Sequence, residues 1–462
     1  MVKPTVLIVG TPDTKLDEIL YLRDQILAEH TCNTKILNVS HTTPPKVRTR
    51  LDSLAADEVI SPLEEHSSTL KDLSRGEYID KAIELCTPVV KDLVSKAVAV
   101  HGIISAAGSS GSSLATALMR HACPVGFPKL MVSTMASGDI KHYVEETDIT
   151  MMYSVVDIAG INSILKRILA NAAAAISAMT VSYAKSLVDA SAVESKGKRI
   201  AITMFGNTTP CVDAVRQILT SAPHDASDYE IYVFHATGSG GRAMERLIAE
   251  GQIDAVVDLT TTEIPDELFG GVLSAGPDRL EVAAKKGIPL VVSVGACDMV
   301  NFGPKDSVPE KYTKDRNLFV HNPAVTLMRT TPEENAQIGQ FIVDKLATHA
   351  SNPSAIRVLL PERGVSMLDA PGKPFHDPKA DKALFDTIEE GLEATKIDVE
   401  RHDLHINDEL FAGHVASAIL EVMGVTQRNY RLANARRRKW SFDHGASVML
   451  ARKNSQIEIP DA

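Results

Sequence analysis

The sequence has few cysteines, and their positions do not match a metal site or a disulfide framework. Five occur in 462 residues, and no two form a CxxC pair. They are Cys32, Cys86, Cys123, Cys211 and Cys297. This scatter argues against a zinc ribbon and against a disulfide-stabilised secreted domain. A reducing compartment fits best, so the sequence predicts a cytoplasmic protein.

Excess positive charge and long apolar runs are also absent. The formal net charge is -11, and we expect no nucleic-acid partner because binding phosphates requires clustered cations. The opening run MVKPTVLIVG reads straight into a strand and is too short for a signal peptide. Residues 168–184 are uncharged but rich in alanine, which offers lipid little apolar surface. We therefore expect no membrane association, and interpret this segment as a buried helix or a subunit contact.

The apolar residues that are present alternate between strand-like runs and helical spacing. Continuous apolar strands followed by helices indicate parallel sheets covered on both faces. The pattern restarts after the charged stretch ESKGKR at 194–199. The sequence thus predicts an α/β protein with two doubly wound, Rossmann-like lobes. We assign residues 1–195 and 196–424 to the lobes, 425–462 to a basic and polar tail, 41–80 to an irregular segment, and 155–190 to one long helix.

Three loops of the first lobe, each directly after an apolar strand, are rich in glycine, serine and threonine. Glycine lets the backbone approach a phosphate, and N–H groups at a helix N-terminus point at the anion. The alternative is that the hydroxyls are helix caps, but three such loops in one lobe favour a nucleotide or phosphorylated ligand. The candidate ligand-binding residues are Gly10, Thr11, Asp13, Thr14, Lys15, Gly108, Ser109, Ser110, Gly111, Ser112, Thr134, Ser137 and Gly138.

The specific signatures of known nucleotide and hydrolase sites are missing. No GxxxxGK[ST] sequence occurs, and no GxGxxG follows the first strand, so neither a Walker-type loop nor a dinucleotide fingerprint is indicated. No HExxH motif or Ser-His-Asp set stands out. No sequence motif defines a set of metal ligands.

The second lobe repeats the pattern, with VFHATGSGGRAM resembling IISAAGSSGSSL of the first lobe and suggesting a duplication. Its candidate catalytic residues are Arg242, Glu263 and Asp298. Arg242 follows glycines and could clamp a phosphate or carboxylate, or simply pair with Glu245. Glu263 and Asp298 follow strands and could bind a metal or act as general base, or cap loops.

Several motifs together resemble one family. They include GTPDTKLDE, GSSGSSL, PKLMVSTMASGD, TMFGNTTPCVDAV, DLTTTEIPDELFGGV and PERGVSMLDAPGKPFHDP, and they span residues 6 to about 420. The chain resembles the family that includes the inhibitory domain of the plant tomato mosaic virus resistance protein. The resemblance implies two Rossmann-like domains, a homodimer and ATP binding, with phosphates on loops 10–15, 108–113 and 134–138. Ser109 and Ser110 stand where the family often has an additional glycine.

We therefore expect a protein that binds ATP or a related nucleotide, with Mg²⁺, on the loops of the first lobe. Three alternatives stay open for its role. It could engage a protein partner, act as an ATP-dependent ligase, kinase or hydrolase on a small acid, or act on a small carboxylated or phosphorylated metabolite. The sequence also predicts that Gly111→Val abolishes nucleotide binding while the fold survives.

Overall fold

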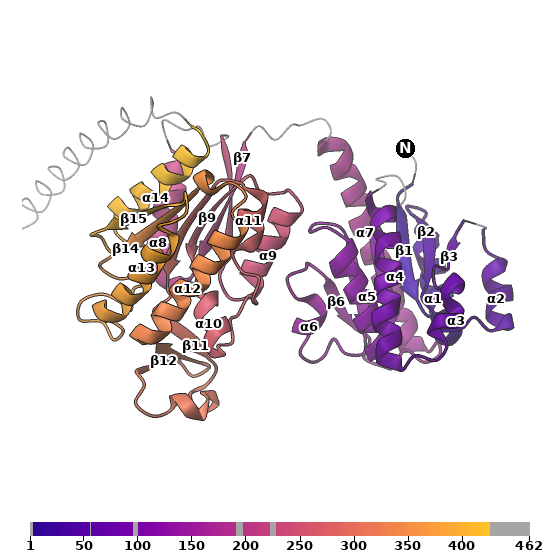
Figure 1. Cartoon of the computed structure of the whole chain (residues 1–462). Coiled ribbons are helices and arrows are strands. Elements are labelled where there is room, and N and C mark those ends of the chain that lie inside the picture. Colours follow the sequence, from indigo (N-terminus) through magenta and orange to yellow (C-terminus); the bar gives the residue numbers. More distant parts are fainter. Residues whose placement is uncertain (1–2, 56, 96–99, 191–196, 222–227, 426–462) are drawn as a thin grey trace, which may run out of the picture. The chain divides into compact units, whose positions relative to one another are not determined.

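The computed structural model describes residues 3–55, 57–95, 100–190, 197–221 and 228–425 (Figure 1). The chain divides into two compact units, Met1–Ser195 and Lys196–Ala462. We call them lobe one and lobe two. Apart from its first residue, the tail predicted at 425–462 lies outside the described residues, including the basic run at 435–439.

Lobe one is built on a six-stranded parallel sheet. Its strands are β1 (Thr5–Gly10), β2 (Asn33–Asn38), β3 (Val59–Ile60), β4 (Gly102–Ala107), β5 (Lys129–Ser133) and β6 (Thr150–Tyr153). Their order is β3-β2-β1-β4-β5-β6. This is the strand order of dinucleotide-binding Rossmann folds. In these folds successive strands are added toward one edge of the sheet and then, from the fourth strand on, toward the other. Ligands bind at this switch point, between the first and fourth strands.

Helices cover both faces of this sheet, because alternate strand residues point to opposite sides. Val6 and Ile8 pack with α1 (Pro12–Ala28) and α7 (Ser163–Ala190) on one face. Leu7 and Val9 pack with α4 (Arg75–Ser95) and α5 (Ser109–Ala122) on the other. The core of lobe one is therefore two apolar layers on either side of the sheet.

The alanine-rich segment of the sequence lies within α7. Among the described residues, α7 is the one helix long and apolar enough to span a membrane by length and composition. Its Leu165, Leu169 and Ile176 are fully buried and pack in the same cluster as the strands of lobe one. This packing accounts for the apolar residues on one face of α7, and 39% of its apolar stretch is buried within the lobe.

Lobe two contains a second six-stranded parallel sheet with a different topology. Its strands are β7 (Lys198–Met204), β8 (Tyr229–His235), β9 (Ala255–Thr260), β10 (Leu290–Gly295), β14 (Ile356–Pro361) and β15 (Asp398–His402). Their order is β15-β14-β10-β9-β7-β8, which is the order of flavodoxin-like folds. The prediction of two doubly wound α/β lobes is confirmed.

Helices again cover both faces of the second sheet. One face carries α8 (Thr209–Leu219) and α14 (Glu409–Val422). The other carries α9 (Ser239–Ala249), α11 (Glu281–Lys286), α12 (Pro332–His349) and α13 (Pro378–Leu392). The short helix α10 (Glu263–Phe269) follows β9, and a three-stranded antiparallel sheet is formed by β11 (Met299–Phe302), β13 (Val325–Arg329) and β12 (Leu318–Asn322).

Several sequence-based expectations differ from the structure. The segment 41–80 contains α2 (Pro45–Asp52), α3 (Ser67–Leu70) and the first turn of α4. The helix expected from residue 155 begins at Ser163. The two glycine loops that suggested a duplication also occupy different places, because β4 lies in the middle of its sheet and β8 lies at an edge.

Candidate functional site

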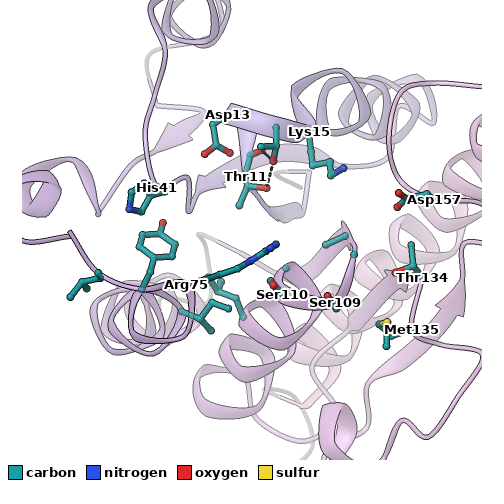
Figure 2. A pocket seen from close by; sticks show the side chains of 18 residues that line it. Thr11, Asp13, Lys15, His41, Arg75, Ser109, Ser110, Thr134, Met135 and Asp157 are labelled. Atoms are coloured by element: carbon teal, nitrogen blue, oxygen red, sulfur yellow. Dashed lines mark hydrogen bonds between the residues drawn. The ribbon is translucent and has the colours of Figure 1, made fainter. Parts of the chain in front are cut away.

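A pocket of about 650 Å³ opens in lobe one, where β1 and β4 end (Figure 2). Its size falls within the range of small-molecule and cofactor sites. The pocket lies at the switch point between β1 and β4, where this fold binds ligands. The residues that line the pocket are Thr11, Asp13, Thr14, Lys15, His41, Leu73, Arg75, Tyr78, Ile79, Ala107, Gly108, Ser109, Ser110, Gly111, Leu114, Thr134, Met135 and Asp157.

The N-terminus of α5 forms one wall of the pocket. Gly108 caps this helix without any side-chain hydrogen bond, and the N–H of Ser112 donates to the Gly108 carbonyl at 2.9 Å. The N–H groups of Ser109, Ser110 and Gly111 precede that bond, so no carbonyl within the helix can accept from them. The helix dipole adds partial positive charge at this end, which makes the wall suited to an anion.

The N-terminus of α1 also borders the pocket, but its backbone donors are already used. Pro12 has no N–H, and the N–H of Asp13 donates to Ser40 Oγ at 3.1 Å. Those of Thr14 and Lys15 donate to the Thr11 carbonyl at 3.0 and 2.9 Å. Within α1, the side chains of Asp13, Thr14 and Lys15, and not their backbone N–H groups, are therefore what a ligand would meet.

Two cations border the pocket. The Arg75 side chain extends from the start of α4 into the middle of the pocket, between Thr11 and Ser110 (Figure 2). No acidic side chain in the described part of the chain pairs with Arg75. Lys15 donates through Nζ to the carbonyl of Ile158, so its charge is beside the pocket and without a carboxylate partner among the residues described.

Near the end of β2 the pocket is lined by aromatic and apolar side chains. The rings of His41 and Tyr78 meet edge to face with centroids 4.8 Å apart. Both are held in place, because His41 Nε2 contacts the Leu70 carbonyl at 3.1 Å and the Tyr78 hydroxyl donates to the Val39 carbonyl at 2.8 Å. Burial, and then the negative charge of Asp13, raise the pKa of Tyr78. Leu73 and Ile79 complete this more apolar side.

The pocket brings together most of the residues predicted from the sequence. Thr11, Asp13, Thr14, Lys15, Gly108, Ser109, Ser110, Gly111 and Thr134 line it. Gly10, Ser112, Ser137 and Gly138 do not, and two of these have clear packing roles. A Cβ on Gly10 would lie 2.5 Å from Ile19 Cδ1, while the buried Ser112 hydroxyl bonds to Ser133 Oγ at 2.6 Å.

The pocket residues that lie far from the glycine loops were not predicted from the sequence. Arg75, Tyr78 and His41 fall in the segment that was interpreted as irregular, and Asp157 lies within the residues predicted as helix. One signal was available in the sequence, because RGEYIDKAIELC at 75–86 places Tyr78, Ala82 and Cys86 at helical spacing. These residues are buried on one side of α4, and the helix that they define begins at Arg75.

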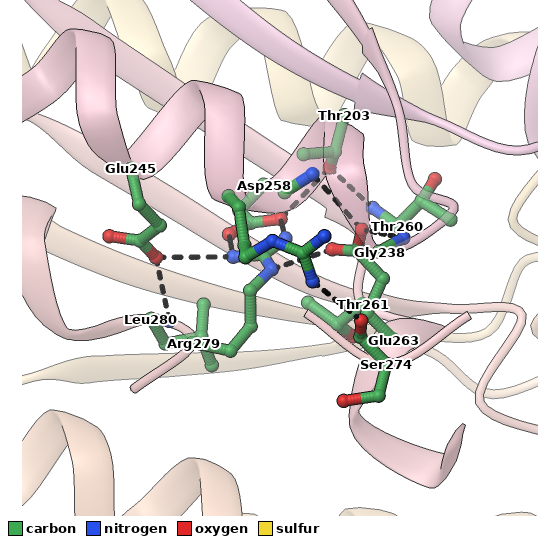
Figure 3. A network of polar contacts seen from close by, with 12 residues as sticks. Thr203, Gly238, Glu245, Asp258, Thr260, Thr261, Glu263, Ser274, Arg279 and Leu280 are labelled. Atoms are coloured by element: carbon green, nitrogen blue, oxygen red, sulfur yellow. Dashed lines mark hydrogen bonds and ion pairs between the residues drawn. The ribbon is translucent and has the colours of Figure 1, made fainter. Parts of the chain in front are cut away.

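In lobe two, the glycine-rich loop is filled by a side chain of the protein itself. Glu263 Oε1 accepts the N–H groups of Gly238 at 2.6 Å and Gly241 at 3.0 Å. Its Oε2 accepts Arg279 Nε at 2.8 Å (Figure 3). A carboxylate thus occupies the place that an anion would take at the start of α9. Glu263 is fully buried, and its contacts are those of a structural residue.

The other two catalytic candidates of lobe two also have internal partners. Arg242 donates to the Ser274 carbonyl at 3.2 Å. Asp298 is fully buried and accepts the Ser366 hydroxyl at 2.8 Å. Burial, together with the neighbouring Asp369, raises the pKa of Asp298. Arg242, Glu263 and Asp298 are thus each bonded to other groups of lobe two.

A metal site made only of protein ligands is not found in the part of the chain that the structure describes. No cluster of three or more histidine, cysteine, aspartate or glutamate side chains there could hold an ion. Mg²⁺ usually keeps several waters and binds through one or two carboxylates plus the phosphates of a nucleotide. Asp157, near Thr134 in Figure 2, is a carboxylate of that kind at the pocket wall.

Comparison with known proteins gives a consistent result over both lobes. The model of the "Uncharacterised protein family (UPF0261) N-terminal domain" matches residues 4–185, and that of the C-terminal domain matches 197–423. A UPF0261 protein of Clostridium tetani is 44% identical over 424 residues, which are 90% of this chain and 98% of that protein. A UPF0261 protein of Rhizobium meliloti is 42% identical over 416 residues, covering 90% and 98%.

The resemblance to the plant resistance protein is confirmed. The ToMV resistance protein Tm-1 of Solanum lycopersicum is 38% identical over 435 residues, which are 91% of this chain and 56% of the tomato protein. A solved UDP-N-acetylglucosamine 2-epimerase is similar over 63% of this chain and 79% of its own, at 10% identity and a TM-score of 0.21. By the match of both domain models and of these relatives, the chain belongs to the UPF0261 family.

Proposed function

We propose that this protein binds ATP or a related nucleotide in the lobe-one pocket, with the phosphates at the N-terminus of α5. The observation that carries the proposal is the set of backbone donors at Ser109, Ser110 and Gly111, which face a pocket of about 650 Å³. Anions bind at such helix ends because N–H groups and the dipole act together. The serine hydroxyls add further donors to the same wall.

The cations of the pocket support the same proposal. Arg75 reaches the middle of the pocket and has no carboxylate partner in the described chain. An arginine without a partner can form a bidentate contact with a phosphate. Lys15 could exchange the Ile158 carbonyl for a phosphate oxygen, a charge-assisted bond that is stronger than one to a neutral acceptor.

The pocket wall also offers oxygen donors for Mg²⁺. Asp157 and the Thr134 hydroxyl are the oxygen donors that would hold Mg²⁺ together with the phosphates. When bound, the ion would neutralise phosphate charge. The protein's own part is to position the phosphate chain on α5 and Arg75.

The arrangement favours binding over catalysis by the lobe-two candidates. Glu263 and Asp298 are fully buried, and Glu263 is committed to Gly238, Gly241 and Arg279. A nucleotide-binding protein that engages a partner therefore remains our first proposal. An enzyme that uses ATP on a small acid would have to draw its acid or base from lobe one, where Asp157 lines the pocket.

A charge placed at the first residue of α5 tests the proposal. In Ser109→Asp, a carboxylate lies beside the N–H groups assigned to phosphate. We expect affinity for Mg²⁺-ATP, measured by titration calorimetry, to fall about tenfold or more, which is at least about 1.4 kcal/mol. Stability should hold or rise, because an acidic residue at a helix N-terminus interacts favourably with the dipole.

The matched control is Ser113→Asp, one turn further along the same helix. Ser113 lies outside the pocket lining, and its hydroxyl donates to the Ser109 carbonyl at 3.2 Å. We expect the control to retain affinity within about threefold. Equal loss of affinity in both variants, or unchanged binding in Ser109→Asp, would place the phosphates elsewhere.

A further inference from the structure

The pocket contains a carboxylate with no partner, and phosphate binding does not explain it. Asp13 Oδ1 is buried and makes no hydrogen bond. No basic side chain of the described chain forms an ion pair with Asp13, although the residue lines the pocket. A carboxylate without a hydrogen-bond donor is costly to bury, and the part of the half-buried Asp13 that lines the pocket can receive donors from a ligand.

The helix dipole accounts for only part of this arrangement. Asp13 lies in the first turn of α1, where a negative charge is favourable. A charge that only served the dipole could point to solvent. Asp13 instead points into the pocket on the same side as His41 (Figure 2), and its backbone N–H is fixed by Ser40.

Asp13 and the phosphate wall belong to different parts of the pocket. Asp13 lies on α1, which covers one face of the sheet, and Ser109 lies on α5, which covers the other. A phosphate beside Asp13 would be repelled by its charge. A ligand must therefore present its anion to α5 and hydrogen-bond donors to Asp13.

Hydroxyl groups next to an apolar wall match the surroundings of Asp13. Tyr78, Leu73 and Ile79 line this side of the pocket and can cover the face of a sugar or base. In dinucleotide-binding folds an acidic residue near the end of the second strand accepts from the ribose hydroxyls. Here β2 is followed by Val39, Ser40 and His41, with no acid among them.

We propose that Asp13 recognises the ribose hydroxyls of the ligand, so that the pocket selects ribonucleotides over deoxyribonucleotides and over plain polyphosphates. The inference rests on the proposed function and adds the class of ligand. Asp13 takes the recognition role from α1, while α5 and Arg75 take the phosphates. The adenine itself is not specified by this contact.

Calorimetric titrations of the full chain test the inference. The ligands are ATP, 2′-deoxyATP, 3′-deoxyATP and inorganic triphosphate, each with Mg²⁺, on the natural protein and on Asp13→Asn. We expect the natural protein to prefer ATP over at least one deoxy analogue by about tenfold, as for a hydrogen bond to a charged group. Asp13→Asn should reduce this preference to about twofold or less and should bind triphosphate at least as tightly.

The control variant is Asp17→Asn. Asp17 is exposed on the same helix and pairs with Arg50 at 2.7 Å, outside the pocket lining. It should retain the preference for ATP. Thermal unfolding of each variant verifies that the fold is intact.

The other possible results separate failure of the ribose contact from failure of the nucleotide site. Equal affinity of the natural protein for ATP and both deoxy analogues overturns the ribose contact and leaves the nucleotide site standing. A preference for ATP that survives in Asp13→Asn, or a parallel loss of triphosphate binding in that variant, also overturns it. If the natural protein binds neither ATP nor triphosphate, the proposed function itself fails.

Discussion

At the scale of single residues, the two lobes differ in what their glycine-rich loops hold. In lobe two the loop at 237–242 binds Glu263, which is anchored by Arg279. In lobe one the corresponding donors at Ser109, Ser110 and Gly111 face the open pocket. Similar loop sequences thus have different roles, because only one of them has a carboxylate from the same chain within reach.

Arg279 neutralises the negative charge of two buried carboxylates of lobe two, Asp258 and Glu263. It forms contacts of 2.5 and 2.7 Å with Asp258 and 2.8 Å with Glu263, and it is 2% exposed. Replacing it in Arg279→Met leaves these carboxylates buried without a cation. We expect the free energy of unfolding, measured in urea at pH 7, to fall by about 3–5 kcal/mol.

An exposed ion pair provides the control for Arg279. Arg363 contacts Asp403 at 2.6 and 2.7 Å, but both side chains are exposed. Solvent screens such a pair, so Arg363→Met should leave the free energy of unfolding almost unchanged. A loss in Arg279→Met no larger than that of the control would contradict the structural role of the buried network.

At the scale of elements, the two helices at the mouth of the pocket contribute in different ways. The first turn of α1 satisfies its own backbone and presents Asp13, Thr14 and Lys15 as side chains. The first turn of α5 presents its backbone. Strands β1 and β4 are neighbours in the sheet, so both helix ends meet at the same opening.

Close packing at the start of α5 changes how Gly111 should be tested. A Cβ at Gly111 would lie 2.5 Å from the Cβ of Ala107 on β4. Gly111→Val would therefore disturb the contact between helix and strand, contrary to the expectation that the fold survives. Loss of binding in that variant would not distinguish packing from phosphate recognition, which is why Ser109→Asp is the better probe.

The elements that the sequence predicted well are those with long apolar patterns. The strand at 5–10 and the strands at 254–260 and 289–295 are fully or almost fully buried, and buried parallel strands form continuous apolar runs. Strands β6 and β15 were missed because they are edge strands of mixed polarity, TMMY and DVERH. The antiparallel sheet of β11, β12 and β13 was missed because its strands are only four or five residues long and β11 pairs with β13, which is distant in the sequence.

The candidate site was predictable only as far as its glycine loops. Glycine and serine after a strand mark Ser109 and Ser110 directly. Arg75 and His41 enter the pocket through strand order and the start of α4, which one sequence does not determine. The engagement of Glu263 by Gly238 and Gly241 depends on a contact between residues about 25 positions apart in the chain, which no local motif reveals.

At the scale of the whole molecule, buried acids make stability depend on pH. Burial raises the pKa of Asp266 to about 7, and burial also raises those of Asp298 and Asp381 beside Arg329. In the unfolded chain these carboxyl groups ionise near the ordinary aspartate pKa of 3.8. Between about pH 4 and 7 these three aspartates therefore hold more protons in the folded state than in the unfolded chain, and their contribution to stability falls as pH rises.

The variant Asp298→Asn tests this dependence. An asparagine keeps the acceptor for Ser366 and cannot ionise. We expect urea unfolding between pH 5 and 8 to show a smaller loss of stability than in the natural protein, by about 1.4 kcal/mol for each pKa unit of difference removed. The exposed Asp306→Asn is the control, and an unchanged pH slope in Asp298→Asn would count against the buried-acid account.

Hydrogen–deuterium exchange of the full chain, with and without saturating Mg²⁺-ATP, tests whether the phosphates bind at the N-terminus of α5. We expect slower exchange in peptides that contain residues 107–113 and 73–79, because the donors of α5 and the turn that carries Arg75 would contact the ligand. The loop at 237–242, already closed by Glu263, should exchange at the same rate in both conditions. Protection of 237–242 without protection of 107–113 would contradict the account.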